Sequence, residues 1–321
     1  MFSSYKTMKL QQLRYLTEVV RRGLNVSEAA AALHTSQPGI SKQIRSLEEE
    51  LGIQVFVRHG KRLVSLTEPG KAAVGIAERI LSEAQNLRRA GEEFANDQLG
   101  KLTIAATHTQ ARYALPPAVA AFKRRYPNVE LVLQQGNPTQ ICEQVLAGEA
   151  DLGVATEMIE ETRELVSLPV YQWNRMVVVP PRHPLLKAKP LTLEKLAEHP
   201  IVTYDFAFAN RSLVQKAFEA RGLMPHVVLS AQDSDVIKTY VELGLGVGIL
   251  AKMAFDPGRD RGLHGIDASH LFESSMTRLG IKRGAYLRRY AYEFIELFAP
   301  HLPRAVVERA VTGQEASAYE L

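Results

Sequence analysis

Strands and helices alternate twice along the last two thirds of this chain, and this repeat constrains the fold more than any other feature. The first copy runs as strand, helix, strand, helix and strand over residues 102–156, from "LTIAATHT" to "ADLGVAT". The same order returns over residues 200–252, from "PIVTYD" to "GVGILAK". Because alternating strands and helices build βαβ units, the repeat predicts two similar α/β subdomains with parallel sheets.

Two further segments are expected to link these subdomains. The stretch "YQWNRMVVVPPRHPLLKAKP" is expected to supply the first crossing strand, and "TRLGIKRG" returns the chain to the first subdomain. A hinged pair of such units resembles periplasmic binding proteins, which implies a ligand between the halves. We expect this part at residues 99–321, with subdomain I at about 99–169 and 274–300 and subdomain II at about 170–273.

The first seventy residues have another pattern, three short helices followed by a hairpin. Apolar residues recur at helical spacing in "LQQLRYLTEVVRRG", four alanines are consecutive in "NVSEAAAALHTS" with Asn25 or Ser27 as a cap, and Pro38 falls in the first turn of a third helix. After Gly52, "IQVFVRHGKRLVSLTEPG" alternates as two strands do, with a turn at His59-Gly60. This order is the outline of a winged helix-turn-helix.

Positive charge is concentrated in this head. Residues 1–65 contain ten Lys and Arg against five Asp and Glu, a net +5, while the whole chain carries +4. In the third helix Lys42 and Arg45 precede three glutamates at 48–50, although the helix macrodipole favours the opposite order. A helix whose first turns enter the major groove of DNA has a use for cations there. We interpret the head as DNA-binding, with an ordinary solvated basic face as the alternative.

The head also resembles a known family. From "LRYLTEVVRRG" through "HTSQPGISKQIRSLEEELG" to the wing end at Thr67 and Gly70, it is similar to LysR-type transcriptional regulators. The resemblance implies a winged helix-turn-helix domain over residues 1–66, double-stranded promoter DNA as a partner, and contact with RNA polymerase. The positions that match DNA-contacting residues are Ser36, Gln37, Pro38, Ser41, Lys42, Arg45, Arg58, Lys61 and Arg62. For each, a solvated surface residue is the alternative.

A long connecting helix is predicted over residues 67–98. Its apolar and small residues alternate at steps of four and three, as in the seam of a two-stranded coiled coil, at Ala73, Ala77, Ile80, Ala84, Leu87, Gly91 and Phe94. We predict that two chains dimerise here, so that paired heads read two half-sites. Packing of one amphipathic helix against its own domain is the alternative. The family resemblance implies a homotetramer of two dimers.

Three loops of the α/β part are candidates for ligand binding. In such sheets ligands lie beyond the carboxyl ends of the strands, at helix N-termini. This rule selects Thr107-His108-Thr109-Gln110, Thr156, and the stretch "TYDFAFANRS" at 203–212. Their hydroxyl and amide groups suit a small anion. Capping of the adjacent helices is the alternative role for the threonines, and packing is favoured over base chemistry for His108.

The α/β part resembles one subgroup of the family more closely. The stretches "THTQARYALP", "GNPTQI", "QWNRMVVV", "DVIKTYVELGLGVGIL" and "FAPHL" are similar to CysB-type activators of sulfur-assimilation genes. In these proteins a tetrahedral anion or an acetylated serine is held by residues matching Thr107, Thr109, Gln110 and Thr156. A further family threonine falls at Ala209, where the hydroxyl is absent, so the effector stays open among sulfate, thiosulfate, O-acetylserine and N-acetylserine. Genes for sulfonate or sulfate-ester use are the alternative target.

Other classes of protein fit the sequence less well. The glycines of "GLGVGIL" follow a helix and precede a strand, which is the reverse of a phosphate-binding loop, and no hydrolase or Walker motif occurs, so we expect no enzyme. The single Cys142 excludes an intrachain disulfide, and we expect a buried, unreactive thiol. Neither a long apolar run nor the apolar core of a signal peptide is present, so a soluble cytoplasmic protein is expected rather than a solute-binding transport protein.

Overall fold

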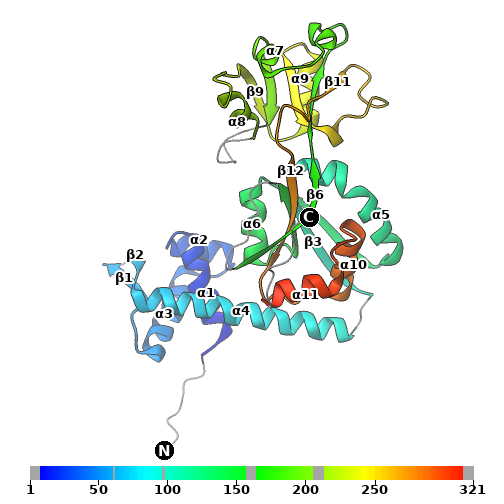
Figure 1. Cartoon of the computed structure of the whole chain (residues 1–321). Coiled ribbons are helices and arrows are strands. Elements are labelled where there is room, and N and C mark those ends of the chain that lie inside the picture. Colours follow the sequence, from blue (N-terminus) through cyan, green and yellow to red (C-terminus); the bar gives the residue numbers. More distant parts are fainter. Residues whose placement is uncertain (1–7, 61, 96–97, 157–163, 205–212, 314–321) are drawn as a thin grey trace, which may run out of the picture. The chain divides into compact units, whose positions relative to one another are not determined.

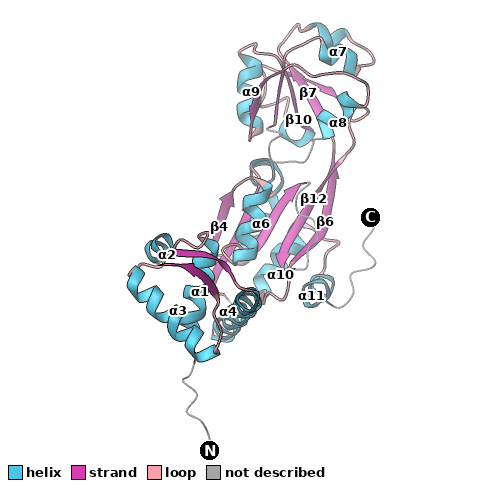
Figure 2. Cartoon of the chain, turned by 90° about the vertical axis from the view of Figure 1, so that its left-hand side faces the viewer, coloured by secondary structure: helices cyan, strands magenta, loops and turns pink. Residues whose placement is uncertain are grey.

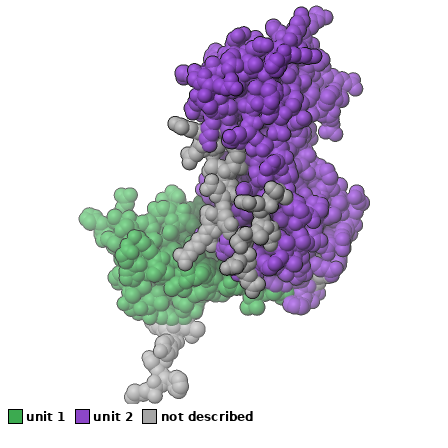
Figure 3. Space-filling view, in the orientation of Figure 1, with its two compact units in different colours: residues 1–91 green, residues 92–321 purple. Residues whose placement is uncertain are grey.

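The computed structural model describes residues 8–60, 62–95, 98–156, 164–204 and 213–313 (Figure 1). The chain divides into two compact units, residues 1–91 and residues 92–321, which Figure 3 shows in separate colours. Each unit has a hydrophobic core of its own. Among the described residues, no helix has the length and apolar character needed to cross a membrane.

Unit 1 begins with three helices, α1 (Leu10–Arg21), α2 (Val26–Ala32) and α3 (Gln37–Leu51). Local sequence sets their ends. Of the two predicted caps for α2, Asn25 is the one observed, because its side chain accepts hydrogen bonds from the first backbone N–H groups of the helix. Gly52 ends α3 in the left-handed conformation that glycine adopts without strain. The apolar faces of the three helices form one core.

The hairpin that follows consists of β1 (Phe56–His59) and β2 (Arg62–Leu66), paired antiparallel. The open end of the hairpin, opposite its turn, is closed by a threonine and a glycine three residues apart. The Thr67 hydroxyl donates to the Gln54 carbonyl at 2.6 Å and accepts from the Gly70 N–H at 2.9 Å. A Cβ at Gly70 would lie only 2.1 Å from the Val55 carbonyl oxygen. This position therefore requires glycine.

The predicted connecting helix is α4 (Glu68–Ala95), and its seam divides into two parts. Ala77 is buried, and Ala73 and Ile80 pack beside it against the core of unit 1. The alternative interpretation, packing against the same domain, therefore holds for this part of the helix. Farther along, Leu87 is 76% exposed and Phe94 is 90% exposed. The second half of the seam thus presents apolar side chains to solvent.

Unit 2 contains two five-stranded sheets, which define subdomains I and II (Figure 2). The strand order is β4-β3-β5-β12-β6 in subdomain I and β11-β7-β10-β8-β9 in subdomain II. In chain order the strands are β3 (Gly100–Ala106), β4 (Val129–Gln135), β5 (Leu152–Thr156), β6 (Leu165–Trp173), β7 (Arg175–Val179), β8 (Ile201–Tyr204), β9 (Val227–Ala231), β10 (Val247–Ala251), β11 (His264–Asp267) and β12 (Ser275–Lys282).

Both sheets are mixed, which corrects the prediction of parallel sheets. The repeated strands are parallel as predicted, β4, β3 and β5 in one sheet and β9, β8 and β10 in the other. However, β12 runs antiparallel to β5 and β6, and β7 runs antiparallel to β10 and β11. The chain leaves subdomain I on β6 and returns on β12, and these two strands lie side by side (Figure 2). Opposite directions of crossing make this pair antiparallel.

Helices cover these sheets. They are α5 (Pro116–Arg125), α6 (Pro138–Ala147), α7 (Leu193–Ala197), α8 (Leu213–Glu219), α9 (Ser234–Glu242), α10 (Arg289–Phe298) and α11 (Arg304–Thr312), with a π-helical turn η1 (Gln110–Ala114) and 3-10 turns η2 (Pro184–Lys187) and η3 (Lys252–Ala254). Aromatic rings tie α5 to α10, since Phe122 meets Phe294 edge to face at 5.6 Å. Cys142 on α6 is half-buried rather than buried, and burial raises the pKa of its thiol.

Candidate functional site

The first candidate site is the start of α3 in unit 1. The Ser36 hydroxyl caps the helix by accepting a hydrogen bond from the Gly39 N–H at 3.2 Å, and Pro38 occupies the first turn. Ser36, Gln37 and Pro38 are all exposed, and the first turn contains no acidic residue. The positive end of the helix dipole is therefore open to an anionic partner.

One face of α3 carries the predicted DNA-contacting residues. Ile40 and Ile44 are buried in the core of unit 1, which turns the helix so that Lys42 and Arg45 are exposed and Ser41 is half-buried. Gln37, Ser41 and Arg45 follow at steps of four and so share a face. Within the part of the chain that the structure describes, Lys42 and Arg45 have no hydrogen bond or ion pair. Both cations are available to a partner.

Arg58 in the wing lies in a different environment from these residues. Its guanidinium makes a two-pronged contact with the Glu48 carboxylate, at 2.6 and 3.1 Å, and Glu48 is only 3% exposed. Sequence reasoning placed Arg58 among the DNA contacts and treated Glu48 only as part of an acidic helix end. Arg62 is exposed on β2, and the predicted contact Lys61 lies outside the described residues.

The second candidate site begins at the loop after β3. The Thr107 N–H donates to the Val154 carbonyl at 3.1 Å, and the Thr107 carbonyl accepts from the Ala111 N–H at 2.9 Å. The chain then enters η1, a π-helical turn of a kind often found at functional sites. No side chain caps η1, and the hydroxyl of Thr107 has no partner among the described residues. Capping of the adjacent helix, the alternative role for Thr107 and Thr109, is therefore not observed.

Gln110 is buried in the network that holds this loop. Its Nε2 donates to the Thr277 hydroxyl at 3.1 Å, and the Tyr171 hydroxyl donates to its Oε1. Tyr171 and Thr277 belong to β6 and β12, the two crossing strands. Burial raises the pKa of Tyr171, so this tyrosine stays a neutral donor. The Gln110 amide thus fastens the loop to the strands that connect the subdomains.

Thr109 extends toward subdomain II. Its hydroxyl lies 3.5 Å from the hydroxyls of Tyr204 and Ser234, which are 2.6 Å from each other. Tyr204 ends β8 and accepts a hydrogen bond from the Ala251 N–H at 3.1 Å, while Ser234 is the first residue of α9. Three hydroxyls from two subdomains therefore converge. We call Thr109, Tyr204 and Ser234 the hydroxyl cluster.

The other predicted effector residues are placed less fully. Thr156 ends β5 directly opposite Thr277 of β12, so it lies on the same side of the sheet as the residue that accepts from Gln110. Ala209 lies outside the described residues. His108 points its Nδ1 into the protein, where the described residues offer it no hydrogen-bond partner.

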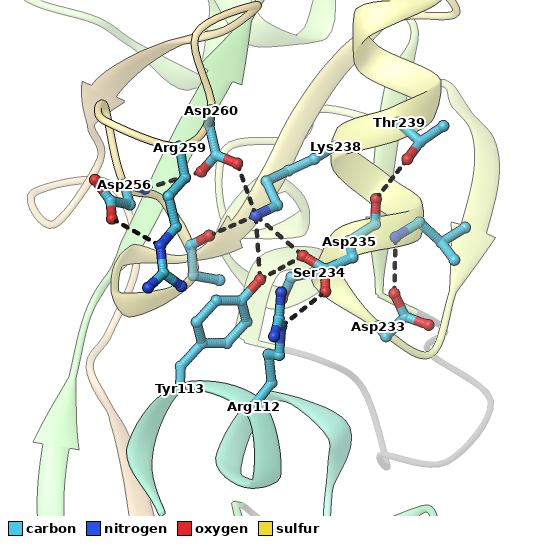
Figure 4. Close-up of polar contacts among 12 residues, drawn as sticks. Arg112, Tyr113, Asp233, Ser234, Asp235, Lys238, Thr239, Asp256, Arg259 and Asp260 are labelled. Carbon is cyan, nitrogen blue, oxygen red and sulfur yellow. Dashed lines mark hydrogen bonds and ion pairs between the residues drawn. The ribbon is translucent and has the colours of Figure 1, made fainter. Parts of the chain in front are cut away.

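A second group of side chains joins the subdomains beside the hydroxyl cluster (Figure 4). Tyr113 of η1 donates to the Asp235 carboxylate of α9 at 2.5 Å, and Arg112 of η1 lies 3.3 Å from the same carboxylate. Lys238, one turn along α9, donates to the Tyr113 hydroxyl at 3.1 Å and contacts Asp235 at 3.1 Å and Asp260 at 3.0 Å. We call Arg112, Tyr113, Asp235, Lys238 and Asp260 the bridging cluster.

The charges of the bridging cluster are stable near neutral pH. Burial acts to raise the pKa of Asp235, but the hydrogen bonds from Tyr113 and Lys238 outweigh it and lower the value. For Lys238, burial acts to lower the pKa, and its hydrogen bonds to Tyr113 and Asp260 raise it overall. Burial, then the hydrogen bond to Asp235, raises the pKa of Tyr113. An ionised aspartate, a protonated lysine and a neutral tyrosine result.

Sequence reasoning singled out neither Tyr204, nor Ser234, nor any member of the bridging cluster. The selected stretch 203–212 contains Tyr204, and the rule that favours helix N-termini would also have selected Ser234 at the start of α9. The bridging cluster offered no such pattern, because its members come from separate segments. Donor hydroxyls and amides without a nucleophile–base pair suit binding of a polar ligand rather than catalysis.

Two family models match this chain. The model described as bacterial regulatory helix-turn-helix protein, lysR family, matches residues 10–71, and the model described as LysR substrate binding domain matches residues 95–303.

Relatives with curated descriptions are similar over nearly the full length. The chain is 56% identical to the HTH-type transcriptional regulator CysB of Burkholderia cenocepacia, over 98% of this chain and 100% of that protein. It is 53% identical to the regulator SsuR of the same organism, over 94% of this chain and 97% of that protein. Among solved structures, the cofactor-binding domain of the Cbl transcriptional regulator matches with a TM-score of 0.64 at 44% identity, covering 67% of this chain and 95% of that one.

Proposed function

Since this chain belongs to the LysR family of transcriptional regulators, in the sulfur-related group of CysB, SsuR and Cbl, we propose that it controls sulfur-assimilation and cysteine-biosynthesis genes in response to a small anion or acetylated serine. Its relatives are regulators rather than enzymes, and the LysR substrate binding domain takes small-molecule effectors. The proposed place of action is the cytoplasm, where promoter DNA and RNA polymerase are found.

The exposed face of α3 carries the DNA-binding part of this proposal. Lys42 and Arg45 are held outward by the buried isoleucines of the same helix and have no partner among the described residues. The first turn adds exposed Ser36 and Gln37 beside the positive end of the helix dipole. Such a helix start fits the major groove, where base edges are read, while Arg62 on the wing reaches the backbone.

The test measures affinity for a promoter fragment at matched salt. Lys42→Ala or Arg45→Ala should weaken binding by about 1–3 kcal/mol if the side chain reads a base, while effector binding stays intact. Lys216→Ala is the matched control, because it removes one exposed cation from α8 in unit 2. Promoter affinity that stays unchanged in both α3 variants would count against α3 as the reading helix.

The hydroxyl cluster and its neighbours support the effector part. Thr107 and Thr109 stand at the carboxyl end of β3, where ligands of such sheets bind, and Thr156 stands at the end of the adjacent β5. We assign effector contact to these threonines, with Gln110 holding their loop and Ala209 as a position that lacks the family hydroxyl. One missing hydrogen bond is worth roughly 0.5–1.5 kcal/mol, which retunes affinity without abolishing it.

A calorimetric panel of sulfate, thiosulfate, O-acetylserine and N-acetylserine tests this assignment. The ligand that binds with the greatest affinity identifies the effector class. The double variant Thr107→Val, Thr109→Val should abolish the heat of binding while promoter affinity without effector is retained. Heat that survives in this variant would move the site elsewhere.

Regulation of sulfonate or sulfate-ester utilisation genes is a second candidate. The nearly equal identity to CysB and to SsuR, 56% and 53%, favours keeping it, as does the missing hydroxyl at Ala209. Transcript profiles of a deletion strain grown on sulfate and on a sulfonate distinguish the two candidates. Loss of cysteine-biosynthesis transcripts on sulfate supports the first, and loss confined to sulfonate growth supports the second.

The exposed half of the α4 seam supports the proposed assembly. Leu87 and Phe94 are large apolar side chains left open to solvent, and we assign them to a dimer contact, with a tetramer as the complete assembly. Leu87→Asp should break this dimer contact and so halve the mass of the assembly measured by sedimentation. Glu83→Asp on the same helix should leave that mass unchanged. An effector alters transcription only if it binds the two arrangements of the assembly with unequal affinity.

A further inference from the structure

The Glu48–Arg58 pair stands apart from the exposed cations of the DNA-binding unit. Glu48 lies on α3, one residue after the buried Leu47, and its Oε1 accepts hydrogen bonds from the Val55 N–H at 2.8 Å and the Phe56 N–H at 3.3 Å. The same carboxylate takes both prongs of the Arg58 guanidinium, at 2.6 and 3.1 Å. One buried side chain therefore holds the start of β1 and its third residue.

These contacts fix the wing relative to the reading helix. The N–H groups of Val55 and Phe56 lie where the chain leaves α3 and enters β1, and Arg58 lies two residues farther along β1. The other end of the hairpin is fastened as well, because the Thr67 N–H donates to the Val55 carbonyl at 3.0 Å. The hairpin tip with Arg62 is thus carried on a base attached to α3.

The pair is also electrically neutral, which separates Arg58 from the other cations. A guanidinium that is held by a buried carboxylate releases few counterions on binding DNA. Each phosphate-contacting cation, in contrast, makes the fall of log affinity with log salt steeper by about 0.9. Phosphate contacts determine most of the affinity for random DNA, and placement of the reading elements determines discrimination between sequences.

We propose that Arg58 is a positioning residue, which with Glu48 holds the wing at a fixed offset from Lys42 and Arg45 and so determines discrimination between promoter and random duplex. This inference rests on the proposed DNA-binding function. It departs from the resemblance-based assignment of Arg58 to the DNA itself. The Arg58 side chain is 26% exposed, so a direct phosphate contact is the rival that the experiment must distinguish.

Two full-length variants separate these roles. Arg58→Gln removes the cation. Glu48→Gln keeps an oxygen for the Val55 and Phe56 N–H groups but releases Arg58 from its charged partner. Affinity is measured for a promoter fragment and for a random duplex of equal length, at four salt concentrations. Arg62→Gln serves as the control for loss of an exposed wing cation.

If Arg58 positions the wing, both variants lose about tenfold in the ratio of promoter to random affinity, as one mismatched base pair typically causes, and the salt slope of Arg58→Gln stays unchanged. Arg62→Gln instead makes the salt slope shallower by about 0.9 and weakens binding to both duplexes equally. The proposal is overturned if Arg58→Gln lowers the slope in the same way while Glu48→Gln retains discrimination.

Circular dichroism melting of each variant completes the test. If Arg58→Gln does not fold, Glu48→Gln decides alone, because it keeps the backbone contacts of the carboxylate. Loss of the folded unit in both variants would also overturn the proposal, since the pair would then maintain the domain rather than place the wing. A wild-type protein that fails to discriminate the promoter from random duplex would instead refute the DNA-binding function itself.

Discussion

Two polar connections in this molecule resemble each other in composition but join different kinds of parts. In unit 1, Glu48 and Arg58 connect α3 to β1, two elements that share one hydrophobic core. In unit 2, the bridging cluster connects η1 of subdomain I to α9 of subdomain II. The sheets of these subdomains are packed in separate cores.

The difference teaches which connection can open. The Glu48 side chain is 4% exposed, so its contacts break only if the surrounding core opens. The Asp235 side chain is 41% exposed, so water can replace its partners while both cores stay intact. Exposed charge pairs contribute little to stability, and buried ones cost much when broken. The first connection is a fixed part of the domain, and the second suits hinged closure around an effector.

The largest expected effect follows removal of the buried carboxylate. Glu48→Ala leaves Arg58 without its partner and two backbone N–H groups unbonded, so we expect a loss of roughly 3–5 kcal/mol in the free energy of unfolding. Urea denaturation measures it. Glu49→Ala, at the exposed neighbouring position, should change stability by less than about 0.5 kcal/mol. Similar losses in the two variants would remove the contrast between buried and exposed glutamates.

A smaller effect is expected in the bridging cluster. Lys238→Met removes the ammonium that contacts Asp260 and Asp235. We expect the free energy of unfolding to fall by about 1–3 kcal/mol. The single tryptophan, Trp173, ends β6 and packs against the same hydrophobic cluster as Tyr113 and Tyr204, so its emission reports this junction. We expect a red shift under native conditions, before any unfolding.

Arg221→Met is the matched control for that variant. Its guanidinium pairs with Glu194 of α7, and both side chains are exposed on subdomain II. Its emission should equal that of the wild-type protein. An unshifted spectrum in Lys238→Met would show that the apolar contacts alone keep the subdomains together.

The hydroxyl cluster should contribute less to stability than either charge network. Thr109→Val removes contacts of 3.5 Å, at the limit of hydrogen bonding, so we expect a change below about 0.5 kcal/mol in unfolding free energy. The same change should weaken effector binding by roughly 0.5–1.5 kcal/mol, as seen by calorimetry. A variant that loses stability but keeps its effector affinity would make Thr109 a structural residue.

Between pH 5 and pH 9 we expect no change at the junction at all. The lowered pKa of Asp235 gives a stabilisation that is present above the unfolded value of 3.8 and lost only as the pH falls through the folded value. The raised pKa of Lys238 gives one that is complete below 10.5 and lost as the pH rises through its folded value. Trp173 emission checks this. A transition between pH 5 and pH 9 would contradict it.

Sequence reasoning succeeded where local periodicity carries the information. The buried face of α1, the cap of α2 and the repeated parallel strands follow from spacing along one segment, and the family assignment is confirmed by the matching models and relatives. The individual DNA and effector contacts stay predictions. The antiparallel course of β12 was missed, because strand direction depends on which way the chain returns between subdomains.

By itself, the sequence determined the order of elements, the family and the exposed cationic face of α3, since apolar periodicity decides which face of a helix is buried. Only the tertiary structure decided the partners of the charged residues. It brought Arg58 to Glu48 across ten positions and Tyr113 to Asp235 across more than a hundred. Burial beside an opposite charge converts an apparent surface cation into a structural one, and burial is a property of the folded chain.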